Sequence, residues 1–205
     1  MYIPASFSET DAVTLYQFMR GNNFATLITS VDGQLAATHL PFLVDAENGL
    51  LRAHLARANP QWKCFDGREV LVIFQGPHAY ISPTWYEVLP SVPTWNYTAV
   101  HVYGAPRIID DEAAMHSLLD TLVEQHEHGR TPEWRMDVPD DYLHKMMQGI
   151  VAFDLPIARV EGKFKLSQNR SAVDVDGVIT ALAHSPLELD RATATLMEQR
   201  REPAA

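Results

Sequence analysis

Residues 24–109 contain a long series of segments with the composition of β-strands, separated by signals for tight turns. The segments are rich in Val, Ile, Thr and aromatic residues, and they read FATLITS, LAATHLPFLV, LLRAHL, EVLVIFQG, HAYISP and TWNYTAVHVYGAPRII. VDGQ and AENG place Asp-Gly and Asn-Gly between the first three segments, where a hairpin needs positive φ. The pattern predicts that these three strands form an antiparallel meander.

Helical patterns lie mainly outside this strand-rich region. Apolar residues at helical spacing predict a helix over about 9–21, before the first strand. EAAMHSLLDTLVEQHEHG, closed by Gly129, and the shorter PDDYLHKMMQG predict two more helices after the last of these strands. Strands in a row with helices at the ends favour an antiparallel barrel of the α+β class over a parallel βαβ sheet.

The C-terminal third adds strands and then helices. IVAFDLPIARVEGKFKLS predicts one more strand pair, and the following tail has a helical pattern interrupted at Ser185-Pro186. We expect one domain over residues 1–185 and a C-terminal helical tail over residues 186–205.

Charge and cysteine usage exclude several functions. The formal net charge of −10 argues against a broad nucleic-acid-binding face, which needs clustered Lys and Arg. Cys64 is the one cysteine, which excludes an internal disulfide and a multi-cysteine zinc site. No apolar run is long enough to span a bilayer and the start lacks the pattern of a signal peptide, so we expect a cytoplasmic protein without a membrane partner.

The stretch RAHLARANPQW concentrates donor groups where a strand gives way to a helix. Arg52 and His54 lie on one face if LLRAHLA is a strand. Asn59 followed by Pro60 has the order of an N-cap and a first helical residue, beside Arg57. The stretch is consistent with a phosphate site, but these residues by themselves favour an ordinary cap among solvated arginines.

Two further clusters could line a ligand site. In GPHAYISPTWYEVLPSVPTWNYTAVHVYG, prolines stiffen a loop around aromatics including Trp95, and the polar Asn96 lies among them. These aromatics either wall a pocket for a planar ring or pack a core. EGKFKLSQNRS is a donor-rich run at the end of the last strand, and it contains Lys165, Gln168 and Asn169.

The nine histidines do not predict a metal site. His126 and His128, the nearest to a cluster, are spaced i, i+2 at a helix end and point to different sides. The sequence has no HExxH, GxSxG, Walker-type or GxGxxG motif, so it gives no support to a hydrolase or a nucleoside triphosphatase.

Several of these stretches resemble the PaiB-like family, described as FMN-binding negative transcriptional regulators. The resemblance is carried by MYIPASFSETD, THLPFLVD, HLARANPQW, VIFQGPHAYISPTWY, VPTWNYTAVHVYG and EGKFKLSQNRS, and it extends from residue 1 to about 180. It implies the split-barrel fold of the pyridoxamine-phosphate-oxidase-like superfamily, a homodimer, and FMN held at the subunit interface.

The resemblance also implies roles for individual residues. His54, Arg57 and Asn59 would hold the FMN phosphate, while Thr38 and His39 would lie beside the isoalloxazine ring. The run from Lys165 onward would contact the second subunit or the edge of the ring. ATHLPFLV has no arginine or lysine where the oxidase has its basic strand, so oxidation of pyridoxamine phosphate is not implied.

Three functions remain open at this point. The first is a flavin-binding regulator, acting on DNA or, in better agreement with the charge, through a regulatory partner or a metabolite. The second is a flavin-dependent oxidoreductase acting on a small molecule. The third is a haem-binding or haem-degrading protein, with His39, His54 or His101 as the axial ligand.

Overall fold

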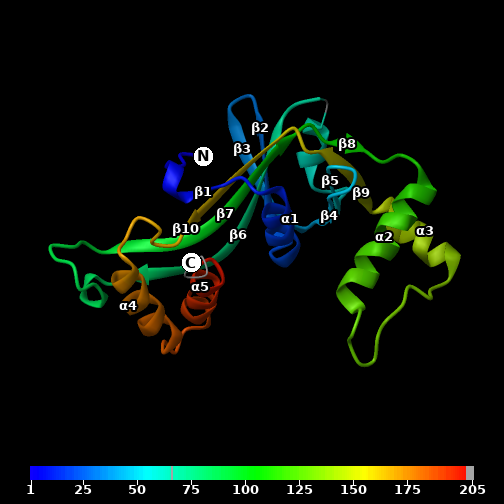
Figure 1. Ribbon diagram of the computed structural model, residues 1–205. Coiled ribbons are helices and arrows are strands. Elements are labelled where there is room, and N and C mark those ends of the chain that lie inside the picture. The colour runs from blue at the N-terminus through cyan, green and yellow to red at the C-terminus, as the bar shows by residue number, and fades with distance from the viewer. Residues whose placement is uncertain (66, 202–205) are drawn as a thin grey trace. The chain divides into compact units, whose positions relative to one another are not determined.

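The computed structural model describes residues 1–65 and 67–201, and its chain divides into two compact units. Unit 1 comprises Met1–Phe18, Gln75–His101 and the chain from Glu161 onward, and unit 2 comprises Met19–Phe74 and Val102–Val160. The long strands β6 (Val70–Ile81) and β7 (Thr94–Gly104) each begin in one unit and end in the other (Figure 1).

The remaining strands are mostly short. They are β1 (Ser8–Glu9), β2 (Phe24–Val31), β3 (Gln34–Pro41), β4 (Leu43–Asp45), β5 (Leu50–Ala56), β8 (Arg107–Ile108), β9 (Ile150–Pro156) and β10 (Arg159–Lys165). The helices are α1 (Ala12–Gly21), α2 (Glu112–Glu127), α3 (Asp140–Gln148), α4 (Ala172–Ala183) and α5 (Glu188–Gln199), with 3-10 turns η1 (Ala5–Phe7), η2 (Pro60–Cys64) and η3 (Pro83–Trp85). The predicted helices are confirmed, and the break at Ser185-Pro186 separates α4 from α5.

In unit 2, the β2–β3 hairpin turns at Asp32 and Gly33, which both have positive φ as the Asp-Gly signal requires. The β2 strand also pairs with the first half of β6, from Thr26 opposite Ile73 to Ile28 opposite Leu71. A second antiparallel sheet has the order β4-β5-β9-β8. No helix among the described residues is long and apolar enough to cross a membrane.

The two consecutive antiparallel pairings of the predicted meander are confirmed, β2 with β3 and β4 with β5, but the strands divide between the two sheets instead of forming one. The middle segment LAATHLPFLV breaks after Pro41 into β3 and β4, and β5 pairs with β4 rather than β3. Phe42 at the break is fully buried, and its N–H donates to Asn23 O at 2.9 Å. Burial of this ring turns the chain into the second sheet, which is a tertiary effect that strand periodicity does not reveal.

The core of unit 2 joins its helices to the second sheet. Leu118 and Leu122 of α2 pack in one cluster with Met147 of α3 and Ala152 of β9. Asp111 caps α2 by accepting from Ala114 N, and Gly129 follows the helix with φ of 81°. The polar first turns of α2 and α3 are exposed to solvent, and the apolar sides of the two helices pack against β9.

In unit 1, the strand order is β1-β10-β7-β6, and α4 and α5 pack against each other (Figure 1). The two strands predicted in IVAFDLPIARVEGKFKLS are present as β9 and β10, but they do not pair with each other, because β9 lies between β5 and β8 and β10 lies between β1 and β7. Gly177 of α4 lies against η3, since a Cβ at this position would be 2.3 Å from Trp85 O. This close approach fixes the loop that carries Trp85.

Candidate functional site

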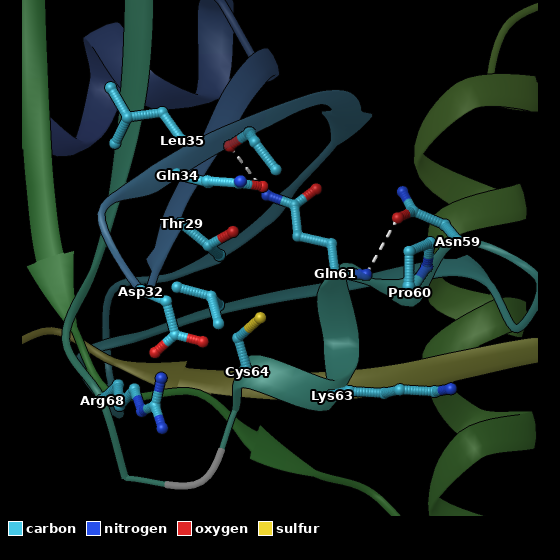
Figure 2. A pocket seen from close by; sticks show the side chains of 12 residues that line it. Thr29, Asp32, Gln34, Leu35, Asn59, Pro60, Gln61, Lys63, Cys64 and Arg68 are labelled. Carbon is cyan, nitrogen blue, oxygen red and sulfur yellow. Dashed lines mark hydrogen bonds between the residues drawn. The ribbon is translucent and has the colours of Figure 1, made fainter.

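A cleft of about 510 Å³ lies in unit 2 between the β2–β3 hairpin and η2, and we call it the hairpin cleft. Gln61 extends from η2 toward the hairpin, with Asp32 and Arg68 at one end of the cleft and Asn59 and Pro60 at the other (Figure 2). The lining is Thr29, Val31, Asp32, Gln34, Leu35, Ala36, Asn59, Pro60, Gln61, Lys63, Cys64 and Arg68. Its volume is within the usual range for small-molecule and cofactor sites.

A network of hydrogen bonds centred on Gln61 shapes this cleft. The Gln61 side chain is 3% exposed, and its amide donates to Leu27 O and Ala36 O, each at 3.2 Å. Its carbonyl accepts from the Thr38 hydroxyl, which in turn accepts from Asn59 Nδ2 at 2.9 Å. The network fixes η2 to β2 and β3 and brings together two predicted site residues, Thr38 and Asn59.

Asn59 has the capping role that the sequence predicts. Its Oδ1 accepts from Gln61 N at 3.0 Å, and Pro60 is the first residue of η2. The helix is a 3-10 turn of five residues, so it presents a single capped turn rather than the end of a long helix dipole.

Thr29 supplies a polar group that the fold itself leaves unused. It lies on the buried face of β2 with Ala25 and Leu27, is 3% exposed, and lines the cleft. Its Oγ1 has no hydrogen-bond partner within residues 1–65 and 67–201. A buried hydroxyl without a partner costs about 1–3 kcal/mol, so this position favours a bound ligand with polar atoms.

Arg57 performs a structural task in this fold. Its Nε donates to Gln148 O at 2.8 Å and its Nη2 to Ile150 O at 2.7 Å, while its backbone N–H donates to Gly149 O. The guanidinium therefore binds the carbonyl of the last residue of α3, where a positive charge is favourable, and the carbonyl of the first residue of β9. Its predicted contact with the FMN phosphate stays a prediction, and this arrangement competes with it.

The two histidines predicted in unit 2 have different surroundings. His39 is exposed, and its Nδ1 lies 3.0 Å from Thr26 Oγ1 on the paired strand. His54 is half-buried on β5, on the same face as Arg52, which pairs with Asp154 at 2.8 Å. Burial lowers the pKa of His54, and its Nδ1 has no partner among the described residues, so a neutral imidazole with a free ring nitrogen is present there.

The other predicted residues lie in unit 1, where most of them already form hydrogen bonds within the fold. Asn96 is fully buried, and its Nδ2 donates to Ser167 Oγ at 3.0 Å. Gln168 bridges within its own turn, donating to Phe164 O and accepting from Leu166 N, and Asn169 is exposed in that turn. These contacts hold the end of β10 to β7, and a role of these residues in binding FMN stays a prediction.

Lys165 and Trp95 are adjacent in unit 1. Lys165 Nζ donates to Thr94 Oγ1 at 2.7 Å and to the carbonyl of Trp95. Burial lowers the pKa of Lys165, and the charges of Lys163 and Arg170 lower it further. The Trp95 ring is half-exposed and lies edge-on to Tyr80, with centroids 5.9 Å apart, so the aromatic segment does wall a pocket.

Sequence reasoning missed Gln61 and Thr29, the two residues that define the hairpin cleft. Gln61 follows the recognised Asn-Pro cap, but nothing in its spacing separates a buried glutamine from a solvated one. Thr29 has the composition of an ordinary strand residue. Its significance follows from the absence of a partner among the described residues, which only coordinates can reveal.

Solved structures similar to this chain define its fold as an α+β antiparallel split barrel of the flavin-binding type. The flavocytochrome Anf3 from Azotobacter vinelandii matches with a TM-score of 0.62 and 17% identity, covering 77% of this chain and 69% of the other. The FAD and heme binding protein from Mycobacterium smegmatis matches with a TM-score of 0.62 and 19% identity, covering 82% and 78%.

The chain belongs to the family whose model is described as "Putative FMN-binding domain", which matches residues 1–159. The Bacillus subtilis (strain 168) protein named "Protease synthase and sporulation protein PAI 2" is 37% identical over 203 residues, covering 98% of both chains. The predicted PaiB-like resemblance and split-barrel fold are therefore confirmed, and FMN is the cofactor of this family. The donor set of the hairpin cleft and its unpartnered Thr29 hydroxyl fit such a ligand.

Proposed function

We propose that the hairpin cleft holds FMN and that the protein is a flavin-binding regulator of the PaiB type. The observation that carries the proposal is the buried Thr29 hydroxyl, which lines the cleft without a hydrogen-bond partner among the described residues. A flavin carries both donors and acceptors around its ring and ribityl chain, so it can satisfy this group. Membership in an FMN-binding domain family supports the same ligand.

Different residues of the cleft would bind or position different parts of the cofactor. Asn59 and Lys63 lie at the end of the cleft where a phosphate finds both an amide donor and a positive charge. The Gln61 amide already donates to two carbonyls of the hairpin, so its role would be to position the walls of the cleft and not to bind the ligand. Bound FMN supplies reversible electron acceptance, which would make the protein's binding state sensitive to redox conditions.

The regulatory part of the proposal rests on the Bacillus relative, whose name refers to protease synthesis and sporulation. A net charge of −10 disfavours direct contact with DNA, so we infer that regulation acts through a protein partner or a metabolite. We also infer a homodimer, because Phe24 and Leu35 on the β2–β3 hairpin are 69% and 77% exposed. Burial of these apolar side chains against a second subunit would remove them from water. A monomeric mass by light scattering would contradict the dimer.

Replacement of Thr29 by valine tests the flavin site. Thr29→Val keeps the shape of the side chain and removes the unpartnered hydroxyl, so the free energy of unfolding should stay equal or rise. The affinity for FMN should fall by a factor of about 3–10, the value of one neutral hydrogen bond. Titration of the protein with FMN, followed by flavin fluorescence, measures the change.

Thr26→Val is the matched control, because Thr26 is on the opposite face of the same strand and bonds to His39. This variant should leave FMN affinity unchanged. Equal FMN affinity of Thr29→Val and the unaltered protein would remove the hairpin cleft as the flavin site. Failure of the unaltered protein to bind FMN at all would remove the proposal.

Two measurements separate regulation from its alternatives. A gel-shift series across salt concentrations should show no specific DNA complex, and a specific shift would instead establish direct repression. Bound flavin should turn over slowly when a nicotinamide cofactor and an electron acceptor are supplied. Rapid cycling would identify a flavin-dependent oxidoreductase.

A further inference from the structure

A second cavity, of about 590 Å³, lies within unit 1, and we call it the aromatic pocket. It is built by four elements: the end of β6, the 3-10 turn η3, the start of β7 and the first turn of α5. Tyr80, Trp85 and Trp95 contribute the large rings, and His78 lies beside Trp95 with centroids 6.3 Å apart. None of its residues lines the hairpin cleft.

The rings form adjacent walls. Tyr80 and Trp95 meet at an interplanar angle of 75°, so their planes enclose a corner instead of stacking. Tyr80 is 47% exposed and Trp95 is 53% exposed, which leaves ring surface available to a ligand. The faces of Trp and Tyr rings carry negative electrostatic potential and attract cations.

Two carboxylates complete the pocket. Glu188 and Asp190, in the first turn of α5, line it together with the aromatic side chains. Asp190 accepts from Ser185 Oγ at 2.6 Å, whereas the Glu188 carboxylate makes no hydrogen bond or ion pair with a side chain of any described residue. Among the described residues, no lysine or arginine lines the pocket, and the nearby Lys165 donates to Thr94 Oγ1 and to the Trp95 carbonyl.

We propose that the aromatic pocket binds an organic cation with an alkylated or quaternary ammonium group. The rings suit the apolar substituents on nitrogen, and the carboxylates suit its charge. A phosphate or another anion would be repelled by Glu188 and Asp190. A neutral apolar ligand would gain nothing from the unpaired carboxylate, so the combination selects a cation.

Choline and its neutral isostere 3,3-dimethylbutanol provide the test, because they share shape and differ in charge. Isothermal titration of the full chain should show choline binding and about tenfold weaker binding of the isostere. Trp95→Leu should weaken choline binding by a factor of about 10, and Glu188→Gln by about 3–5. Trp134→Leu and Glu198→Gln are matched controls outside the pocket and should bind choline normally.

Three results would overturn the proposal. They are no choline binding by the unaltered protein, equal affinity for choline and the isostere, and competition between FMN and choline, which would assign the pocket to the flavin. If Trp95→Leu fails to fold by circular dichroism, the isostere comparison and Glu188→Gln still decide. If Glu188→Gln also keeps its affinity for choline when the isostere binds equally well, the pocket is apolar without selectivity for a cation, and the proposal is wrong.

Discussion

The hairpin cleft of unit 2 and the aromatic pocket of unit 1 differ in both chemistry and construction. The cleft is rich in amide and hydroxyl groups, with Lys63 and Arg68 on its walls, whereas the pocket combines large rings with two acids. The cleft is assembled from residues 29–68, which are close in sequence, and the pocket joins residues 78–95 to residues 187–190. The two proposals therefore assign ligands of opposite charge to the two sites, and variants confined to one lining can test each site separately.

Loss of the Gln61 network should have the largest effect. Gln61→Leu removes the donor to Leu27 O in a buried region and to Ala36 O in a partly buried one, and it removes the acceptor of the Thr38 hydroxyl, which keeps only its bond from Asn59. We expect the free energy of unfolding to fall by about 3 kcal/mol, the sum of partial desolvation penalties for such groups. Urea denaturation measures this loss, and FMN binding should be lost with it while choline binding in unit 1 persists.

Gln34→Leu is the control for this variant, because Gln34 lines the same cleft from an exposed position. Its free energy of unfolding should change by less than about 0.5 kcal/mol, as for ordinary surface substitutions. A similar loss in both variants would mean that the Gln61 network is not what holds η2 to the hairpin.

Overpacking at Gly177 should affect the aromatic pocket of unit 1. In Gly177→Ala, the new Cβ would lie 2.3 Å from Trp85 O, so α4 or η3 must move. We expect a loss of about 1–2 kcal/mol in the free energy of unfolding, since the clash outweighs the gain in helix propensity. Because Trp85 lines the aromatic pocket, choline affinity should fall while FMN affinity is unchanged.

Gly21→Ala is the matched control in a helix, because a Cβ there meets nothing within 4 Å. Thermal and urea denaturation should show equal or greater stability for this variant. Equal choline affinity in Gly177→Ala and the unaltered protein would show that the position of η3 does not matter to the pocket.

Local pattern was enough to predict the elements of this fold and the pairing of strands joined by tight turns, but not the pairing of strands far apart in the sequence. Capping residues, glycines and apolar spacing placed the helices correctly, and the Asp-Gly turn placed the β2–β3 hairpin. The meander prediction missed the break at Phe42, where burial of one ring directs the chain from one sheet into the other. The pairing of β9 with β5 joins segments almost a hundred residues apart, and periodicity carries no information about that choice.

The same distinction applies to the site. The sequence identified Asn59 as a cap and the aromatic segment as a possible pocket wall, because both signals are local. It could not show that the Arg57 guanidinium would be bound by the carbonyls of Gln148 and Ile150, or that Thr29 would have no hydrogen-bond partner among the described residues. Residue type predicts what a side chain can bind, whereas only the three-dimensional structure shows what it already binds.

The smallest expected effect is a pH dependence that arises from His54. Burial lowers the pKa of this imidazole below its ordinary value of 6.5, so the folded protein binds a proton less readily than the unfolded chain. As pH falls below 6.5, His54 binds a proton in the unfolded chain but not in the folded protein. The free energy of unfolding therefore decreases until the pH reaches the pKa of the folded protein. His54→Asn should flatten the dependence of unfolding free energy on pH between about 7.5 and 5, by less than the limit of about 1.4 kcal/mol per pH unit for one proton. Equal slopes in the His54 variant and the unaltered protein would show that His54 is protonated alike in both states.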